Sequence, residues 1–350
     1  MNRRLAATAA VVLSAASMLQ AQDLATNDTA ASVPMPAHRR VRVEAAVAGA
    51  RVDGTSYERV YEQITYGRLA GRTHKLSELV WDIRDVYGIR GTVALQSWDE
   101  RLEIRATLFS ALTAGDGEMV DYDWFLYDRP DFWTHRSRST VDLDYGLDAD
   151  VHGTYRFLER GPVMLSAMVG IRALAWKWTD HGIDFSYSTL GDPSGEPTEG
   201  YTYEQIDPTA LRNFNGPDSS TGIIYEEQFL IPYVGIGIGI TDGRMRADAH
   251  VAYSGLVAAE DRDQHLLRDP PIEYKGSFNT GTYVAYGVSA TFDLTERLFV
   301  SAAFEQQSIA EIRGDISVSS PGDSFSATAA NAGGIEHDSR EASLALGIRL

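Results

Sequence analysis

Residues 232–253 read PYVGIGIGITDGRMRADAHVAY, which is two alternating segments joined by a short polar turn. In residues 232–240 aliphatic side chains alternate with glycines, and in residues 245–253 they alternate with polar side chains such as Arg246 and Asp248. Successive side chains of an extended chain point to opposite faces. The pattern therefore predicts two antiparallel strands, each with one apolar face.

The same alternation recurs along the chain. The other clear examples are residues 102–110, 283–292, 298–304 and 342–350. Short connections such as residues 293–297 join the predicted strands at one end, whereas long polar segments, above all residues 179–227, join them at the other. This asymmetry is typical of a transmembrane β-barrel whose strands continue beyond the bilayer on the side of the long connections. A soluble β-sandwich would also alternate, but its connections would be more even in length.

The N-terminus predicts export from the cytoplasm. Residues 1–21 combine a basic start with an apolar stretch of small residues, as secretory signal peptides do. We expect residues 22–40 to be a flexible mature N-terminus and residues 41–350 to form one barrel domain. The chain has no cysteine, which excludes disulfide bonds, a thiolate nucleophile and a cysteine metal site.

Two short acidic clusters carry the chemistry. Asp121 and Asp123 form the first, and Asp261, Asp263 and His265 form the second. Side chains at i and i+2 share one face of a strand, so the clusters offer carboxylates that can hold a water and an imidazole that can deprotonate it. Each cluster lies about twenty residues beyond a predicted short turn, a climb of roughly 45–55 Å against an apolar band about 25 Å tall. We therefore expect both clusters outside the membrane, at similar height.

The parity of the second cluster requires an irregularity in its strand. The polar lumen positions of residues 245–253 are even-numbered, whereas Asp261, Asp263 and His265 are odd. One extra residue in a strand moves all later side chains to the other face. The sequence therefore predicts a bulge or loop between the two segments.

Each acidic cluster is a weak indicator on its own. With 49 acidic residues in the chain, carboxylates at i and i+2 occur by chance, and most are solvated charges. We interpret the remaining histidines as surface or lumen residues without a comparable carboxylate setting; they include His38, His74, His152, His181, His250 and His337. We expect no metal, because a single histidine lies in the acidic cluster and no His-x-x-x-His spacing accompanies it.

The chain resembles the omptin family of outer-membrane proteases. The matching pieces are Glu58-Arg59-Val60-Tyr61, Met119-Val120-Asp121-Tyr122-Asp123-Trp124 with Trp133-Thr134, Pro232-Tyr233-Val234-Gly235, and Tyr253-Ser254-Gly255 before Asp261-x-Asp263-x-His265. They occur in the family's order from about residue 42 to the C-terminus. The resemblance implies an all-β fold, a ten-stranded antiparallel transmembrane barrel that extends beyond the outer membrane, with its catalytic groove at the exterior rim.

The resemblance also implies roles for these residues. Asp263 would orient His265, the general base toward a water held by Asp121 and Asp123, and no covalent intermediate would form. Neighbouring carboxylates repel each other's ionisation, so the aspartate pair is expected to share a proton. Two further acidic residues match those of the family's pocket for the residue before the cut, P1, and predict cleavage after Arg or Lys. These are Glu58 and Asp261.

Departures from the family pattern limit what carries over. His135 stands where the best-known members have an aspartate in the P1′ pocket, so it is the candidate for that pocket here, and its preference is open. The family's lipopolysaccharide-binding residues would fall at Ile171, Ala173, Ala175 and Gln228, none of which matches. A requirement for lipopolysaccharide is therefore open as well, and would rest on other residues such as Lys177. No other cofactor is expected.

The expected partners follow from this interpretation. Basic peptides and surface-accessible proteins would be substrates, drawn in by the net charge of −18. Outer-membrane lipid and lipopolysaccharide would surround a monomer, and no nucleic acid is expected. The alternative is a non-catalytic barrel of the same architecture that acts as an adhesin or a small pore. A pore is disfavoured, because side chains would largely fill so narrow a barrel.

Overall fold

The computed structural model describes residues 41–65, 67–97, 99–125, 127, 130, 133–188, 211–215, 221–320 and 325–350. The predicted signal peptide, residues 1–21, and the predicted flexible segment, residues 22–40, lie outside the described residues.

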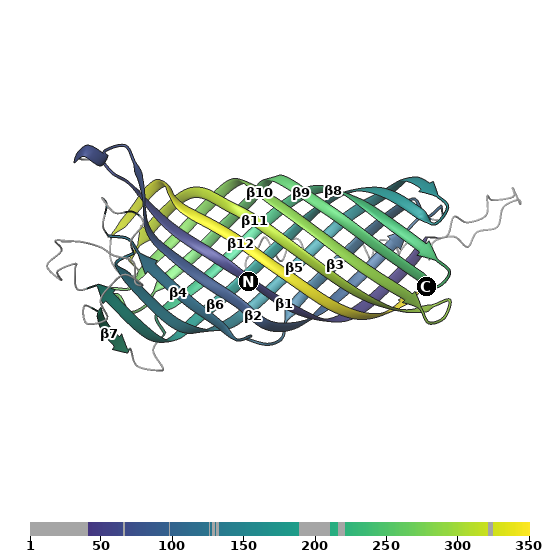
Figure 1. Cartoon of the computed structure of the whole chain (residues 1–350), viewed down its shortest axis with the longest axis horizontal. Coiled ribbons are helices and arrows are strands. Elements are labelled where there is room, and N and C mark those ends of the chain that lie inside the picture. Colours follow the sequence, from purple (N-terminus) through teal and green to yellow (C-terminus); the bar gives the residue numbers. More distant parts are fainter. Residues whose placement is uncertain are drawn as a thin grey trace, which may run out of the picture.

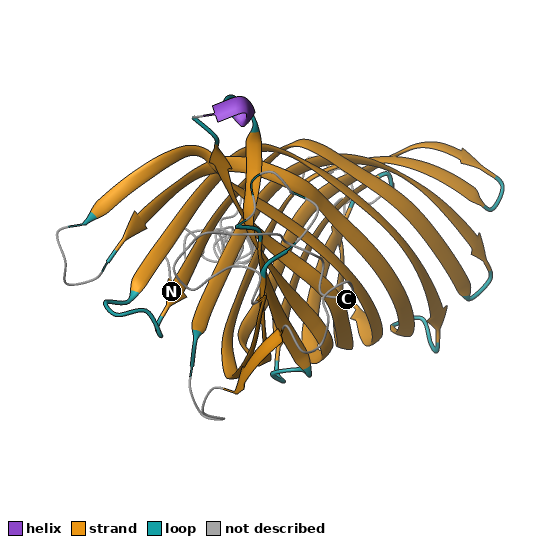
Figure 2. Ribbon diagram, turned by 60° about the vertical axis from the view of Figure 1, so that its left-hand side comes forward, coloured by secondary structure: helices purple, strands orange, loops and turns teal. Residues whose placement is uncertain are grey.

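The described chain is almost entirely β-strand (Figure 1). The strands are β1 (Arg42–Gln63), β2 (Thr73–Gln96), β3 (Leu102–Ala111), β4 (Gly117–Asp123), β5 (His135–Arg160), β6 (Val163–Ser188), β7 (Leu211–Asn215), β8 (Ile223–Asp242), β9 (Met245–His265), β10 (Ile272–Asp293), β11 (Leu298–Ser319) and β12 (Ser326–Arg349). A short 3₁₀ turn, η2 (Gly67–Leu69), caps the β1–β2 connection and stands at the top of Figure 2. None of the described helical residues forms a helix long and apolar enough to cross a membrane.

The strands close into a ring of antiparallel neighbours. β1 pairs with both β2 and β12, and β9 pairs with both β8 and β10. β3 and β4 follow one another between β2 and β5, so they occupy a single position. β7 pairs only with β6, beyond the ring. The ring of described strands thus has ten positions, which confirms the expected ten-stranded barrel.

The interruption between β3 and β4 was not predicted. Gly115 there has φ +76°, and a Cβ on it would lie 2.5 Å from the carbonyl oxygen of Arg84. The Asp116 N–H donates to that same oxygen at 2.9 Å, and the Leu143 N–H donates to the Ala114 oxygen. The chain therefore leaves the ladder briefly and rejoins it on the same side.

The lower part of the barrel, toward the short turns, carries an apolar outer band. Large side chains exposed there include Ile89, Leu108, Val169, Ile236, Val251, Val288 and Leu346. Toward the opposite end, at the left of Figure 1, the strands run on past this band. β5 and β6 have 26 residues each, more than the 9–11 or so that a bilayer needs. The predicted extension beyond the membrane is therefore present.

The predicted irregularity in β9 is a bulge. Ser254 pairs with Tyr283 and Val257 with Gly281, so two residues of β9, Gly255 and Leu256, stand opposite one residue of β10. Below the bulge the buried residues Ala252 and Ser254 are even-numbered; above it they are odd-numbered, namely Val257, Ala259, Asp261 and Asp263. The bulge turns the acidic cluster into the lumen.

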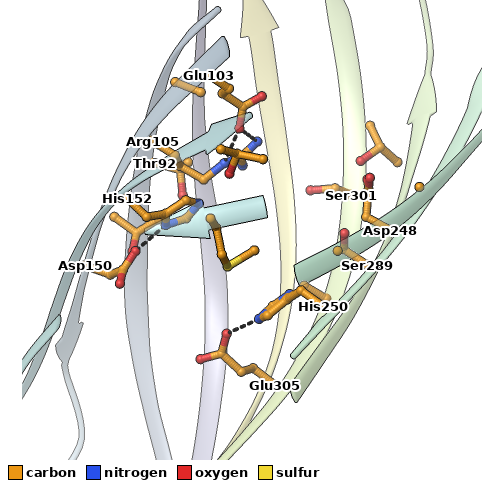
Figure 3. Close-up of a pocket in the computed structure, with 18 of the residues that line it drawn as sticks. Thr92, Glu103, Arg105, Asp150, His152, Asp248, His250, Ser289, Ser301 and Glu305 are labelled. Atoms are coloured by element: carbon orange, nitrogen blue, oxygen red, sulfur yellow. Dashed lines mark hydrogen bonds and ion pairs between the residues drawn. The ribbon is translucent and has the colours of Figure 1, made fainter. Parts of the chain in front are cut away.

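The middle of the lumen is filled by charged side chains. Arg172 donates to Asp148 and pairs with Glu305, and Arg90 bridges Asp148 and Glu341. Below this layer lies a cavity of about 320 Å³, lined by charged, polar and small apolar side chains (Figure 3). The charged layer lies between this cavity and the opposite rim. A pore would need a continuous channel through the lumen, and this layer interrupts it.

Candidate active site

His265 and Asp263 form a hydrogen-bonded pair near the end of β9. His265 Nε2 lies 2.6 Å from Asp263 Oδ2, and the Asp263 side chain is almost fully buried. Tyr274, paired with Asp263 on β10, packs edge-on against the imidazole with ring centroids 5.3 Å apart. Burial would lower the pKa of His265, but the adjacent Asp263 carboxylate outweighs it and raises the pKa above the usual value. Asp263 therefore fixes the imidazole and makes it a stronger base.

Asp121 and Asp123 project from β4 into the same lumen. Ser77 on β2 donates a hydrogen bond of 3.0 Å to Asp121 Oδ1. Burial raises the pKa of Asp121 to about 6, and burial together with the neighbouring Asp121 charge raises the pKa of Asp123 well above its usual value. Both carboxyls therefore resist ionisation, and the charge of Asp121 further opposes the ionisation of Asp123.

The structure brings the two predicted clusters together. β4 and β9 stand on opposite walls of the ring, yet Asp121 and His265 interact electrostatically, each favouring the charged form of the other. The charge of Asp263 also acts on Asp121 and opposes its ionisation. The imidazole and the aspartate pair thus face one another across a single site.

Glu58 and Asp261 form a buried carboxylate pair beside this site. Glu58 is 3% exposed and its Oε2 has no hydrogen-bond partner among the described residues. Asp261 Oδ1 accepts a hydrogen bond of 2.7 Å from the Gly276 N–H. Burial raises the pKa of Asp261 to about 7, and burial with the Asp263 and Asp261 charges raises that of Glu58 well above its usual value. Neither carboxylate forms an ion pair with a positively charged side chain among the described residues. A bound cation would therefore stabilise the ionised form of this buried pair.

His135 lies next to the aspartate pair, at the start of β5. It is the direct cross-strand partner of Asp123, so both side chains are on the same face. Its Nδ1 lies 2.9 Å from Thr134 Oγ1, and its ring packs against Phe125 at 4.9 Å. Burial lowers the pKa of His135. The position is consistent with a pocket on the aspartate side of the groove, which stays a prediction.

The floor of the site consists of residues that the sequence did not single out. Trp81, Tyr225 and Trp178 stack on one another with centroids 5.3 to 6.0 Å apart and are fully buried. Beside them, Glu227 Oε1 lies 2.8 Å from His337 Nδ1. The lumen is therefore closed beneath the groove as well as at the charged layer.

The interpretation of the remaining histidines was wrong about their carboxylate setting, although His152 and His250 do line the lumen cavity as expected. Four of them contact carboxylates: His152 with Asp150, His181 with Asp142, His250 with Glu305 and His337 with Glu227. His74 is bonded to the Trp124 carbonyl instead, and His38 lies outside the described residues. Most of these partners come from other strands, which spacing along the chain does not reveal.

The barrel is closed, has an apolar outer band and carries acidic residues and a histidine at one rim. These features are those of an outer-membrane barrel with a polar site at its rim. The chain belongs to the omptin family: the sequence model described as "Omptin family" matches residues 40–350. This membership confirms the resemblance and places the protein in the outer membrane.

Known relatives agree with this assignment. The chain is 26% identical over 291 residues to the outer membrane protease OmpP of Escherichia coli K12, covering 82% of this chain and 83% of the relative. It is 26% identical over 282 residues to the plasminogen activator of Yersinia pestis, covering 78% and 80%. The crystal structure of the outer membrane protease OmpT from Escherichia coli superimposes with a TM-score of 0.76 at 22% identity, covering 88% of this chain and 97% of that one. Family and relatives together support a protease of the outer membrane.

Proposed function

We propose that this barrel is an endopeptidase that cleaves peptides and surface-accessible proteins after Arg or Lys by direct attack of a water. The observation that carries the proposal is the convergence of three groups at one rim: the Asp263–His265 pair, the Asp121/Asp123 pair and the buried Glu58/Asp261 pair. General base, water-holding acids and a cation pocket are the parts that such a reaction needs.

His265 acts as the general base. With the Nε2 proton donated to Asp263, the other ring nitrogen, Nδ1, is left to accept a proton from the attacking water. The water oxygen then bonds to the scissile carbonyl carbon, and Asp263 stabilises the imidazolium that forms. The reaction proceeds through a tetrahedral intermediate without a bond between enzyme and substrate.

Asp121 and Asp123 act as a unit. Their ionised carboxylate holds the water opposite His265, and Ser77 fixes the orientation of Asp121. We propose that the pair shares a proton, which the raised pKa of both carboxyls favours, and that this proton passes to the leaving amine when the carbon–nitrogen bond breaks. The attacking water leaves its proton on His265 and the amine takes a proton from the aspartate pair, so the site returns to its starting state only when the His265 proton passes to the pair.

Glu58 and Asp261 bind the P1 side chain. A guanidinium or ammonium group supplies the donors and the positive charge that these buried carboxylates lack. The groove faces the exterior, where the net charge of −18 attracts basic segments. Among the described strands every ring position is paired on both sides and the five-residue β7 alone has an unpaired edge, so little strand edge is available for pairing between copies, which supports a monomer.

Lipopolysaccharide is proposed to be dispensable for cleavage. Ile171 is exposed and apolar, Ala175 is buried, and the Gln228 amide is bonded to Glu226. Lys177, the substitute considered from the sequence, is paired with Asp144 at 2.7 Å. None of these groups is placed to hold a phosphate as a free cation would.

The direct test is a quenched fluorescent peptide with one internal Arg, incubated with refolded barrel in detergent. We expect a single cut after Arg, located by mass spectrometry, and a similar rate when lipopolysaccharide is added. The matched peptide with citrulline, which keeps the shape of Arg without its charge, should be cleaved far more slowly. No cleavage of either peptide by a folded barrel, with or without lipopolysaccharide, would contradict the proposal and favour an adhesin.

Preference for Arg is expected to rise with pH. Asp261 has a raised pKa of about 7 and the pKa of Glu58 is raised well above its usual value, so the pocket gains protons as the pH falls through 7, and a cation must displace them to bind. The ratio of kcat/KM for the Arg and citrulline peptides should therefore increase between about pH 5 and pH 8. Taking the ratio cancels the titration of His265. A ratio that is flat or falls over this range would show that the pocket is already ionised.

A further inference from the structure

A buried cluster of three polar side chains joins opposite walls of the barrel below the groove. Ser56 Oγ donates to Glu227 Oε1 at 2.6 Å, His337 Nδ1 lies 2.8 Å from the same oxygen, and Ser56 Oγ lies 2.7 Å from His337 Nδ1. All three residues are 0% exposed. Ser56 on β1 and His337 on β12 are neighbours, whereas Glu227 on β8 stands across the ring.

The cluster touches the pocket from two sides. Glu227 is the direct cross-strand partner of Asp261, and the Cβ atoms of such a pair are about 4.5–5.5 Å apart on one face. Ser56 precedes Glu58 by two residues on β1, so the two side chains share a face one step apart. The charge of Glu227 acts on both Glu58 and Asp261.

The number of available protons determines which groups donate hydrogen bonds within the cluster. Ser56 has one hydroxyl proton, which goes to Glu227, so His337 Nδ1 must be the donor in both of its contacts. The imidazole packs between Trp176 and Phe229, with centroids 5.9 and 5.6 Å away. Glu227 Oε1 therefore accepts two hydrogen bonds from residues whose own positions are fixed by packing.

We propose that Glu227 is a third carboxylate of the basic-side-chain pocket and that Ser56 and His337 are positioning residues that hold it there. The inference rests on the proposed cleavage after basic residues, which it deepens by adding a specificity-determining residue. Glu58 and Asp261 form the sides of the pocket, and Glu227 adds negative charge at its floor. A long side chain with a cationic end is the ligand that such a pocket fits.

The test compares kcat/KM for the Arg and citrulline peptides in Glu227→Gln, which keeps the shape and removes the charge. We expect the Arg-to-citrulline ratio to fall about tenfold, as for the loss of one charge several ångströms from a guanidinium, with the effect mainly in KM. Cleavage of the citrulline peptide should fall less than cleavage of the Arg peptide, because citrulline has no charge for Glu227 to attract, and the unfolding temperature in detergent verifies that the variant is folded. An unchanged ratio would overturn the inference. If Glu227→Gln does not refold, Ser56→Ala takes its place: it removes one of the two hydrogen bonds that hold the carboxylate, so the ratio should fall by a smaller factor, and an unchanged ratio would again overturn the inference.

A double-mutant cycle tests the positioning role of His337. His337→Asn should lower the same ratio in the parent barrel but have no further effect in the Glu227→Gln background, because it acts through Glu227. Additive effects would contradict that role. Glu58→Gln is the reference: if it lowers the ratio and Glu227→Gln does not, only this inference fails, whereas a parent barrel that shows no preference for Arg refutes the proposed function itself.

Discussion

Replacing His265 with alanine is expected to abolish cleavage while the barrel stays folded. The substitution removes the base that takes the proton from water, and general-base catalysis contributes about 10²–10⁴-fold in rate. Asp263 would also lose its partner at 2.6 Å and remain buried. The measurement is the rate of cleavage of the single-Arg peptide, alongside the heat stability of the refolded barrel in detergent.

His152→Ala is the matched control for this experiment. His152 is likewise bonded to an aspartate two residues earlier, Asp150, at 2.5 Å, but it lines the cavity on the side of the short turns (Figure 3). Its loss should leave cleavage unchanged. If His265→Ala stays active and His152→Ala does not, the base has been placed at the wrong end of the barrel. An adhesin would keep its function in both variants.

Removing both pocket carboxylates, in the double variant Glu58→Gln and Asp261→Asn, is expected to remove the preference for basic residues. Breaking a buried charge pair typically costs about 2–5 kcal/mol, and part of that is offset here because binding no longer requires these carboxyls to lose protons. We therefore expect kcat/KM for the Arg peptide to fall about 10²-fold. Cleavage of the citrulline peptide should be affected much less.

Glu103→Gln is the control for charge alone. Glu103 is as buried as Asp261 and pairs with Arg105 in the lower lumen, far from the groove. The substitution removes one negative charge from the barrel and leaves the pocket residues unchanged, so the preference for Arg should persist. Equal losses in the control and the pocket variant would mean that overall charge, and not the Glu58/Asp261 pair, selects the substrate.

Much of the fold could be predicted because side chains alternate between the two faces of a strand, so a strand with one apolar face shows a period of 2 in the sequence. The parity conflict between residues 245–253 and Asp261 even indicated the bulge, now located at Gly255 and Leu256. The break between β3 and β4 could not be read in the same way, because both parts keep odd residues inward and the alternation resumes in phase.

From spacing alone, site residues could be grouped only where they are close in sequence; the grouping of Glu58 with Asp261 came from the family resemblance. Asp121 with Asp123, and Asp263 with His265, share a face by spacing alone. The contact between His337 and Glu227 joins residues 110 apart, and that between Ser56 and His337 joins residues 281 apart. Such contacts depend on ring closure, which no local pattern records.

The bulge in β9 makes the two halves of that strand independent in phase. Below the bulge, the alternation of β9 places apolar side chains toward the lipid. Above the bulge, it places the acidic residues toward the lumen, and the extra residue at Gly255 and Leu256 allows both orientations in one strand. A deletion of one codon there would leave the lipid-facing half intact and rotate Asp261 and His265 outward. The inward orientation of the site residues therefore depends on one residue of chain length as well as on the identity of their side chains. A graft of the rim onto another barrel must therefore keep the number of residues between the bulge and the acidic cluster.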